Sequence, residues 1–277
     1  MKYRNIPVEI NEIDFILFIL PCLSVAQRGF ISKISLYKIF SYILKKLYTG
    51  CQWSALELDC EDKDKVTWQA IYWHFRKWSI DKSLEKVWKL SIESVKNDLD
   101  LSEINLDGTH TISKKGGEDV AYQERKKAKT SNILIFTEKQ GYIIGAMDVM
   151  AGNHHDAFNI KENAAHAFTE MKRDDLTIAG AYLNADKAFD NKDFRKACFN
   201  HGMVPNIDEN QRNRKKIKKG RKRLFNEEVY KHRFTNEAPF AWVDKFRSLV
   251  IRYERKTKYW WALNCVAFAM INLKSLI

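Results

Sequence analysis

The chain has 277 residues, of which 45% are hydrophobic and 30% are charged, with 11 Gly and 4 Pro. This composition supplies enough apolar surface for one large or two modest folded domains, and it excludes a disordered or fibrous protein. Lys and Arg outnumber Asp and Glu by 47 − 35 = 12. Such an excess of positive charge suits a polyanionic partner.

The five cysteines form no Cys-x-x-Cys pair, which argues against a zinc ribbon or a disulfide framework and indicates a reducing compartment. The apolar stretches at 15–26 and 259–273 are too short to cross a bilayer. The acidic flank of the first stretch is unlike a secretory signal, and the second favours a buried C-terminal helix. We therefore expect a soluble, cytoplasmic protein with no membrane partner.

Residues 1–100 are predicted to be helical. Apolar side chains recur at three- and four-residue spacing over 34–47, 66–78 and 84–95, and Gly50 follows the first of these segments as a stop signal. Helices joined by a turn, with basic and aromatic side chains, are compatible with DNA docking. A helical bundle that only packs fits the same pattern equally well.

The periodicity changes after residue 101. Strands are predicted at 104–106, 176–185 and 203–207, and a hairpin joins the runs 132–138 and 142–149 at Gln140-Gly141. Helices are predicted at 160–171, 191–201 and over most of 226–277. This order favours an α/β fold with a mixed sheet and flanking helices.

One loop, residues 212–223, is strongly basic and contains no acid. Nine cations within twelve residues repel one another, so the loop is either solvated or bound to a polyanion. A nucleic-acid contact is the favoured interpretation, and a solubilising loop is the alternative. The nine cations are Arg212, Arg214, Lys215, Lys216, Lys218, Lys219, Arg221, Lys222 and Arg223.

Two acids, Asp107 and Asp186, follow predicted strands. Enzymes that cleave or join phosphodiesters commonly use two divalent ions about 3.5–4 Å apart, held by rigid carboxylates. The carboxyl ends of parallel strands are where such groups meet. A single acid at a strand end is more often a cap residue, so this placement alone is weak support for a metal site.

The sequence around these acids resembles the DDE transposases of bacterial insertion sequences, of the insertion-sequence four/five-like superfamily. The first two acidic motifs are Leu106-Asp107-Gly108-Thr109 and Asn184-Ala185-Asp186-Lys187-Ala188-Phe189-Asp190. The third is Tyr230-x2-Arg233-x3-Glu237, followed by Phe240-Ala241-Trp242, Phe246-Arg247-x-Leu249 and Arg252-Tyr253-Glu254. Further matches are Thr49-Gly50-Cys51-Gln52-Trp53, Phe75-Arg76-Lys77-Trp78, Gly116-Gly117 and Ala151-Gly152-Asn153-His154-His155-Asp156.

This resemblance implies an RNase H-like catalytic domain over 101–277, preceded by a helical region over 1–100 that helps to bind terminal inverted repeats. It implies that Asp107, Asp186 and Glu237 are both the catalytic and the metal-binding residues, with two Mg²⁺ or Mn²⁺ ions as cofactors. Tyr230 and Arg233, one turn apart on a helix, would position phosphates. Lys245, Lys127 and Lys129 are further candidate DNA contacts, although exposed charges are commonly only solvated.

The predicted function is a transposase that cuts DNA at insertion-sequence ends and transfers the freed strand into target DNA. Its partner would be double-stranded DNA, namely the terminal inverted repeats and the target. Two ends must be processed, so a homodimer is expected in the DNA complex, in the nucleoid of a bacterial cytoplasm. The alternatives are an RNase H-like nuclease without strand transfer and a non-catalytic DNA-binding remnant of an inactivated element.

The third motif departs from the family pattern near its acid. Asp244 stands where one branch has a basic residue, with Lys245 next to it, and Ala238 replaces a basic neighbour. Pro239 is tolerated only in a first helical turn, so either a helix starts near Asn236 or it bends beside Glu237.

Several other side chains could approach the site. His154, His155 and Asp156 could form a metal cluster, but adjacent side chains point in different directions. His110 could approach Asp107 or face solvent. Glu254 lies between Arg252 and Arg255 and is predicted to form a helix-surface ion pair.

Overall fold

In the computed structural model, residues 6–25, 32–210, 225–233 and 237–277 are described. The chain forms two compact units, one from 1–97, 111–120 and 241–277, and the other from 98–110 and 121–240. The chain first passes from one unit to the other between Asn97 and Asp98. Residues 241–277 group with the N-terminal helices and not with the sheet.

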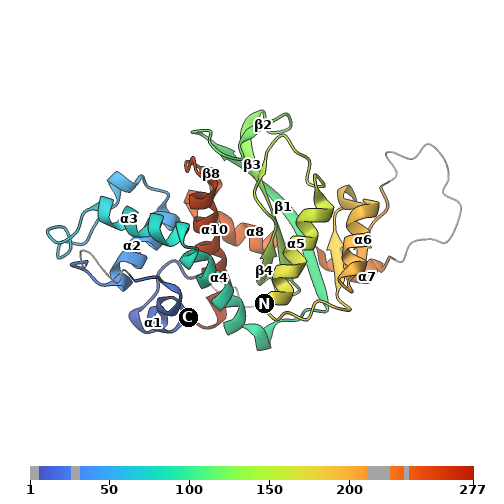
Figure 1. The fold of residues 1–277 in the computed structure, drawn as a ribbon, viewed down its shortest axis with the longest axis horizontal. Coiled ribbons are helices and arrows are strands. Elements are labelled where there is room, and N and C mark those ends of the chain that lie inside the picture. The colour runs from blue at the N-terminus through green and yellow to red at the C-terminus, as the bar shows by residue number, and fades with distance from the viewer. Residues whose placement is uncertain (1–5, 26–31, 211–224, 234–236) are drawn as a thin grey trace, which may run out of the picture. The chain divides into compact units, whose positions relative to one another are not determined.

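The first unit is helical. Its C-terminal helix α10 is buried along almost its whole length and packs against α2, α3 and α4 (Figure 1). The three N-terminal helices predicted from periodicity and the buried C-terminal helix are confirmed. The helices are α1 (Glu12–Phe18), α2 (Leu36–Thr49), α3 (Trp68–Ile80), α4 (Ser83–Ser94), α9 (Arg247–Val250) and α10 (Thr257–Asn272).

Helix α2 begins and ends where its sequence predicts. Ser35 caps its N-terminus, because the Ser35 hydroxyl accepts a hydrogen bond from the backbone N–H of Lys38. Gly50 ends the helix in the left-handed conformation with φ +71°, which favours glycine. A Cβ at this position would lie 3.0 Å from Cβ of Arg247, so the close approach of α9 also favours glycine.

The second unit contains most of a mixed sheet with the order β2-β3-β1-β6-β7. β1, β6 and β7 are parallel, whereas β2, β4 and β5 run antiparallel to β3. The hairpin and the strand-helix alternation are therefore as predicted. The strands are β1 (Glu103–Ser113), β2 (Ala121–Gln123), β3 (Ala128–Glu138), β4 (Ile143–Ala146), β5 (Met150–Ala151), β6 (Tyr182–Ala185) and β7 (Val204–Ile207).

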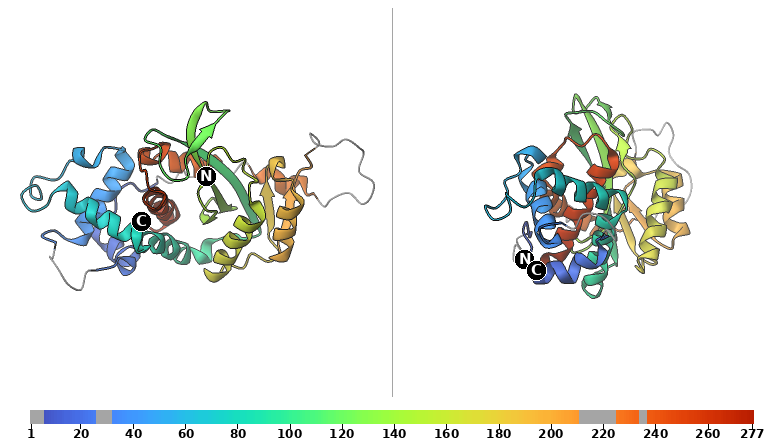
Figure 2. Two further views of the ribbon diagram at one scale, coloured as in Figure 1. Left: turned by 45° about the horizontal axis from the view of Figure 1, so that its top comes forward. Right: turned by 60° about the vertical axis from the view of Figure 1, so that its left-hand side comes forward.

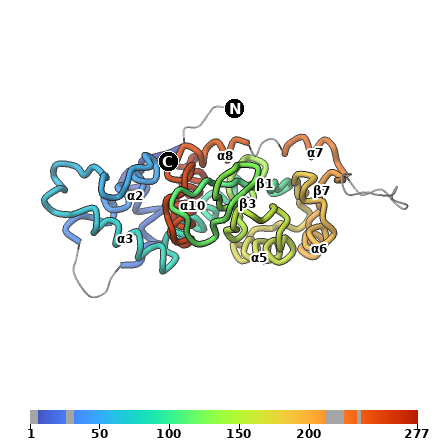
Figure 3. The backbone as a smooth tube through the Cα atoms, turned by 90° about the horizontal axis from the view of Figure 1, so that it is seen from above, coloured from blue at the N-terminus to red at the C-terminus, as the bar shows by residue number. Residues whose placement is uncertain are grey.

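Three helices flank this sheet. α5 (Ile160–Arg173) and α6 (Lys192–Asn200) pack against each other and lie on one face, and α7 (Glu227–Lys231) lies on the other, as the view along the sheet shows (Figure 3). Figure 2 shows the same arrangement from two further directions. The expected mixed α/β sheet with flanking helices is confirmed, and the face that α7 occupies is the one that concerns the candidate site.

Strand β1 is longer than predicted. The sequence suggested a strand ending at Leu106, but β1 continues to Ser113, so Asp107 lies within the strand and not after it. Only the pairing with β6 stops at Leu106, where Leu106 is opposite Ala185. β1 continues because β3 remains its neighbour and because Ile112 and Ser113 pair with β8 (Ile251–Arg252) within the first unit.

None of the helices in the described ranges is long and apolar enough to cross a membrane.

Candidate active site

Asp107 and Asp186 follow paired residues of two neighbouring parallel strands. Leu106 and Ala185 are the last register partners of β1 and β6, and each acid is the next residue in the chain: Asp107 lies within β1, and Asp186 directly follows β6. Because side chains in register on parallel strands point to the same face, the two carboxylates project together. Asp186 also caps a short 3-10 turn, where one of its carboxylate oxygens accepts a hydrogen bond from Ala188 N–H.

The two acids share one electrostatic environment. Burial raises the pKa of Asp107, and the negative charges of Asp156 and Asp186 add to this effect. The Gly108 N–H, which donates to Oδ1 of Asp107 at 2.8 Å, and the charge of Arg233 act in the opposite direction. Arg233 lies 3.8 Å from Oδ2 of Asp186. Carboxylates this close to one another attract positive charge, and Arg233 partly neutralises them here.

A third carboxylate, Asp156, lies near Asp107 but on the other face of β1, because it faces Gly108 and His110, whose side-chain positions alternate with that of Asp107. A Cβ built on Gly108, the residue after Asp107, would be 3.6 Å from Oδ1 of Asp156. The same oxygen accepts a hydrogen bond from Asn132 at 2.6 Å and lies 3.4 Å from His110 Nε2. These contacts lower the pKa of Asp156, and the contact with His110 has the largest effect.

His110 therefore faces Asp156 and not solvent, since its side chain is 8% exposed. Sequence reasoning considered Asp156 only as one of three possible metal ligands. The signal that could have singled it out is the His-His-Asp motif just after the hairpin. The neighbouring His154 instead stacks on Phe158, with ring centroids 3.7 Å apart.

A row of three buried asparagines crosses the sheet two residues before the acid pair. Asn105, Asn184 and Asn206 are register partners on β1, β6 and β7. Asn184 donates to Asn105 at 2.9 Å, and Asn206 donates to Asn184 at 2.8 Å. Asn105 and Asn184 each stand two residues before an acid, so the row and the acids share a face.

This asparagine row also holds α7 on the sheet. Asn206 exchanges two hydrogen bonds with the backbone of Asn226, at 2.8 and 3.0 Å. Asn226 is the N-cap of α7, and its side chain accepts hydrogen bonds from Glu228 N–H and Val229 N–H. These hydrogen bonds fix the position of α7 on this face of the sheet. Their donors are the buried Asn206 side chain and backbone N–H groups.

Helix α7 carries Tyr230, and Arg233 follows just after the end of the helix. The Arg233 guanidinium lies 5.6 Å from the centroid of the Tyr230 ring, an arrangement typical of a cation–π contact. Burial raises the pKa of Tyr230. The expected pairing of these two residues is thus present, with Arg233 directed towards Asp186.

Glu237 is the first residue of α8 (Glu237–Asp244) and is exposed. Pro239 is the third residue of that helix, so it lies in the first turn, where proline is tolerated, and the helix does not need to bend at it. Across the described ranges, no group of three or more His, Cys, Asp and Glu side chains could hold a metal ion. The assignment of Glu237 as third ligand to Asp107 and Asp186 stays a prediction.

The remaining candidate DNA contacts are surface residues or lie outside the described residues. Lys127 is exposed in the turn between β2 and β3, with φ +47°, and Lys129 is exposed on β3. Lys245 is exposed just after α8. The nine cations of 212–223, namely Arg212, Arg214, Lys215, Lys216, Lys218, Lys219, Arg221, Lys222 and Arg223, lie outside the described residues.

Glu254 differs from its prediction. It does not lie on a helix surface but between β8 and α10, and its side chain is 10% exposed. Its Oε1 pairs with Lys46 Nζ at 2.9 Å, not with the adjacent arginines. The prediction was wrong because the helix expected over 226–277 is interrupted by the short strand β8, which turns this segment inwards.

The profile of DDE superfamily endonucleases matches residues 99–271 of the chain. No curated protein matches significantly. Two solved structures show distant likeness. A Mos1 transposase paired-end complex with left transposon end has a TM-score of 0.28 and 9% identity, over 65% of this chain and 61% of that one. A pre-cleavage Mos1 transpososome has a TM-score of 0.27 and 8% identity, over 82% of each chain.

The profile match covers Asp107, Asp186, the asparagine row, α7 and Glu237. It therefore confirms the resemblance to DDE transposases that the motifs carry. The chain belongs to the DDE superfamily endonucleases.

Proposed function

We propose that the chain is a DNA transposase, which cleaves DNA at the ends of an insertion sequence and joins the freed ends to target DNA. The observation that carries the proposal is the pair Asp107 and Asp186. Each directly follows one of the last two paired residues of β1 and β6, Leu106 and Ala185, and the pair faces Arg233. The pair lies within the segment that matches the endonuclease family. Carboxylates at adjacent strand positions with a nearby guanidinium suit phosphoryl transfer.

The proposed reaction has two steps of the same kind. In the first, a water oxygen attacks phosphorus at an element end, the bond to the 3′ oxygen breaks, and a 3′-hydroxyl and a 5′-phosphate result. In the second, this 3′-hydroxyl attacks a phosphodiester of the target, so that one P–O bond forms as another breaks. Each attacking oxygen loses a proton and each leaving oxygen gains one.

The carboxylates fit a divalent cation because they are hard oxygen ligands held at rigid positions. Asp107 and Asp186, with Glu237 as the predicted third ligand, would hold Mg²⁺ or Mn²⁺. Two such ions activate the attacking oxygen and stabilise the leaving oxygen when they are bound. Arg233, next to Asp186, would face the negative charge of the scissile phosphate, and the Tyr230 ring helps to hold its guanidinium in place.

DNA binding is proposed for both parts of the chain. The helical residues 1–100 would contact terminal inverted repeats, and the basic segment 212–223 would lie along phosphates. Lys127, Lys129 and Lys245 are exposed and could add contacts. Because two element ends must be processed together, a homodimer on DNA is part of the proposal, as is the bacterial nucleoid as its place of action.

The test is cleavage and joining on DNA that carries the native element ends, with and without magnesium. We expect nicking at the element end and covalent joining to a target duplex, both lost when EDTA is present. Cleavage without joining in any divalent metal would favour the simpler nuclease. Sequence-specific binding without either reaction would favour a non-catalytic remnant of an inactivated element.

A further inference from the structure

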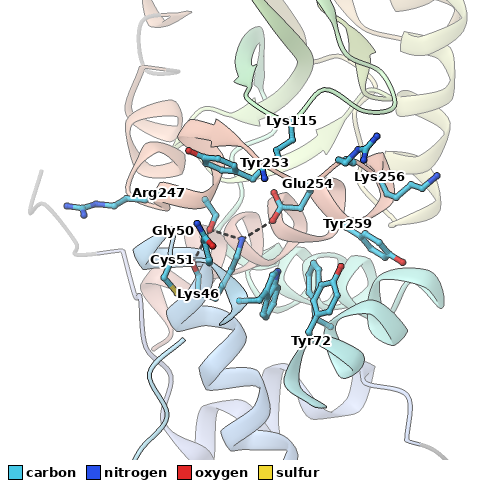
Figure 4. Close-up of a pocket in the computed structure, with 15 residues that line it drawn as sticks. Lys46, Gly50, Cys51, Tyr72, Lys115, Arg247, Tyr253, Glu254, Lys256 and Tyr259 are labelled. Carbon is cyan, nitrogen blue, oxygen red and sulfur yellow. Dashed lines mark hydrogen bonds and ion pairs between the residues drawn. The ribbon is translucent and has the colours of Figure 1, made fainter. Parts of the chain in front are cut away.

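The first unit contains a cavity of about 650 Å³ that is separate from the acid pair (Figure 4). Every residue that lines it belongs to this unit. The motif Gly50-Cys51-Gln52-Trp53, α3, the loop after β1 and the segment from β8 to α10 all contribute. The volume lies within the range of small-molecule and cofactor sites. Its lining combines aromatic rings, cations and one carboxylate.

Aromatic rings form one wall of the cavity. Trp53 lies 5.0 Å from both Tyr72 and Phe75, and Tyr259 lies 6.0 Å from Phe75, all measured between ring centroids. Phe75 is fully buried, while Trp53, Tyr72 and Tyr259 are partly exposed. Arg76, on the same helix as Tyr72, donates to the Tyr259 hydroxyl at 3.1 Å and so ties α3 to α10. The partly exposed rings offer flat apolar surface to a planar ligand.

The lining of the cavity also carries cations. Lys115 and Arg255 are exposed, and within the described ranges neither makes an ion pair, whereas Lys256 is paired with Glu118 at 2.7 Å. The loop that carries Lys115 is held against Arg255, because Glu118 N–H donates to the Arg255 carbonyl at 2.9 Å. Gly117 permits this approach, since its φ is +130° and a Cβ would overlap the Arg255 backbone. Lys115 and Arg255 thus provide positive charge for an anion.

Glu254 supplies a hydrogen-bond acceptor without a donor. Its Oε1 pairs with Lys46, but its buried Oε2 has no hydrogen-bond partner in the described part of the chain. In Figure 4 Glu254 and Tyr253 lie across the cavity from Tyr72. A buried carboxylate oxygen without a donor is costly, so a ligand that donates an N–H to it gains affinity.

From these three features we infer that this cavity binds a nucleoside phosphate. Its base would stack against Tyr72 and Tyr259, an N–H on the edge of the base would donate to Oε2 of Glu254, and its phosphate would contact Lys115 and Arg255. The same chemistry has two sources, a free mononucleotide or one unstacked nucleotide of a DNA strand. The site is distinct from the one that Asp107 and Asp186 form, and its occupancy does not depend on cleavage.

The Glu254 acceptor predicts which bases bind. Adenine, cytosine and guanine carry an exocyclic amino group that can donate to a carboxylate. Thymine offers one N–H flanked by two carbonyl oxygens, which a carboxylate repels. We therefore expect dAMP, dCMP and dGMP to bind more tightly than dTMP, and Glu254→Gln to reduce this preference, because an amide can also donate to a carbonyl oxygen.

The test measures the quenching of tryptophan fluorescence in the full chain by the four mononucleotides, with inorganic phosphate as a comparison. Tyr72→Leu and Lys115→Ala should each weaken mononucleotide binding by on the order of tenfold. Trp73→Leu is the matched control on the same helix, because Trp73 is 53% exposed and does not line the cavity. Far-ultraviolet circular dichroism shows whether each variant is folded, and Lys115→Ala changes only an exposed side chain.

A second arm distinguishes the two sources. A duplex with a single unpaired nucleotide is compared with a fully paired duplex of the same length. If mononucleotides do not bind but the bulged duplex binds more tightly, and Tyr72→Leu removes that difference, the ligand is a nucleotide of DNA. If neither probe discriminates between the wild type and the folded Tyr72→Leu and Lys115→Ala variants, the inference is wrong. Because neither arm measures cleavage, that result would leave the proposed transposase activity unaffected.

Discussion

Asp107 and Asp186 come from strands that pair in parallel only as far as the residue before each acid. They therefore occupy equivalent positions, and the register of the two strands keeps the two carboxylates close together. A one-residue slip between β1 and β6 would send one carboxylate to the opposite face. The register is held by the buried hydrogen bond between Asn105 and Asn184 two residues earlier. Buried polar contacts of this kind select one alignment among several apolar ones.

The acid pair gives the first prediction. Asp107→Asn and Asp186→Asn should each abolish magnesium-dependent cleavage, because an amide is a poor ligand for a hard cation, while DNA binding should persist or tighten. Asp193→Asn, an exposed acid on α6, is the matched control and should keep wild-type activity. Cleavage assays and gel-shift assays on the same DNA measure both properties. Full activity of either active-site variant would remove that residue from the catalytic site.

The asparagine row gives the second prediction. Asn184→Leu should lower the free energy of unfolding by about 1–3 kcal/mol, because Asn105 and Asn206 then lose a buried partner. It should also lower the cleavage rate at temperatures where the protein stays folded, because Asn206, which holds the N-cap of α7, then loses the amide oxygen that orients it. Urea unfolding followed by single-turnover cleavage separates the two effects. Asn200→Leu at the end of α6 serves as the surface control.

Elements of the fold that depend on local sequence patterns could be predicted, whereas elements that depend on pairing between distant strands could not. The helices α2, α3 and α4 follow apolar periodicity, and their positions agree with prediction. The length of β1 did not, because its continuation past Leu106 depends on two different neighbours, β3 and β8, and β8 lies far away in the sequence. The asparagine row depends on register across three strands, and a single sequence carries no signal for register between distant strands.

The same distinction applies to the site. Asp107 and Asp186 could be singled out from their motifs. The register between β1 and β6 then explains why the two carboxylates lie close together. Asp156 was ambiguous, because only the fold brings the segment after β5 beside Gly108. Glu254 was misplaced since its partner Lys46 is more than two hundred residues away. Long-range ion pairs leave no local pattern to detect.

Asp62 gives a prediction for the dependence of stability on pH. Its carboxylate accepts hydrogen bonds from Lys38 Nζ at 2.9 Å and from the Tyr42 hydroxyl at 2.7 Å, and Asp62 is 2% exposed. The bond from Lys38 above all lowers the pKa of Asp62. A carboxyl whose pKa is lower in the folded state stabilises the fold above its unfolded pKa, about 3.9. That stabilisation is lost as the pH falls through the folded pKa.

We therefore expect Asp62→Asn to destabilise the protein clearly at pH 7 and much less at pH 3. Thermal unfolding of both proteins across this range measures the difference. Asp64→Asn, which changes an exposed acid in the loop before α3, should shift neither curve. A difference between wild type and Asp62→Asn that does not change with pH would mean that the Asp62 charge contributes nothing to stability.

The two glutamates of the third motif should behave differently. Glu237 is exposed at the start of α8, so Glu237→Gln should keep the melting temperature and, if Glu237 is the third ligand, abolish magnesium-dependent cleavage. Glu254→Gln leaves Lys46 buried without its charge partner, which costs about 3–5 kcal/mol. It should therefore lower the melting temperature but retain cleavage where the protein is folded. The opposite pattern would show that the third ligand is not Glu237.

The basic segment gives the last prediction, which concerns residues 212–223 as a sequence. If these cations lie along a DNA backbone, replacing Lys215, Lys216, Lys218 and Lys219 with Gln should weaken binding to specific and non-specific DNA alike, because phosphates carry no base identity. The slope of log affinity against log salt should flatten by about 0.9 for each phosphate that the protein no longer neutralises. Fluorescence anisotropy at several salt concentrations measures that slope.

The matched control replaces four exposed lysines outside this segment, Lys63, Lys86, Lys161 and Lys192, which keeps the change in net charge the same. Equal flattening in the control would mean that net charge, and not this segment, attracts the DNA, and an unchanged slope in the segment variant would mean that these lysines are only solvated.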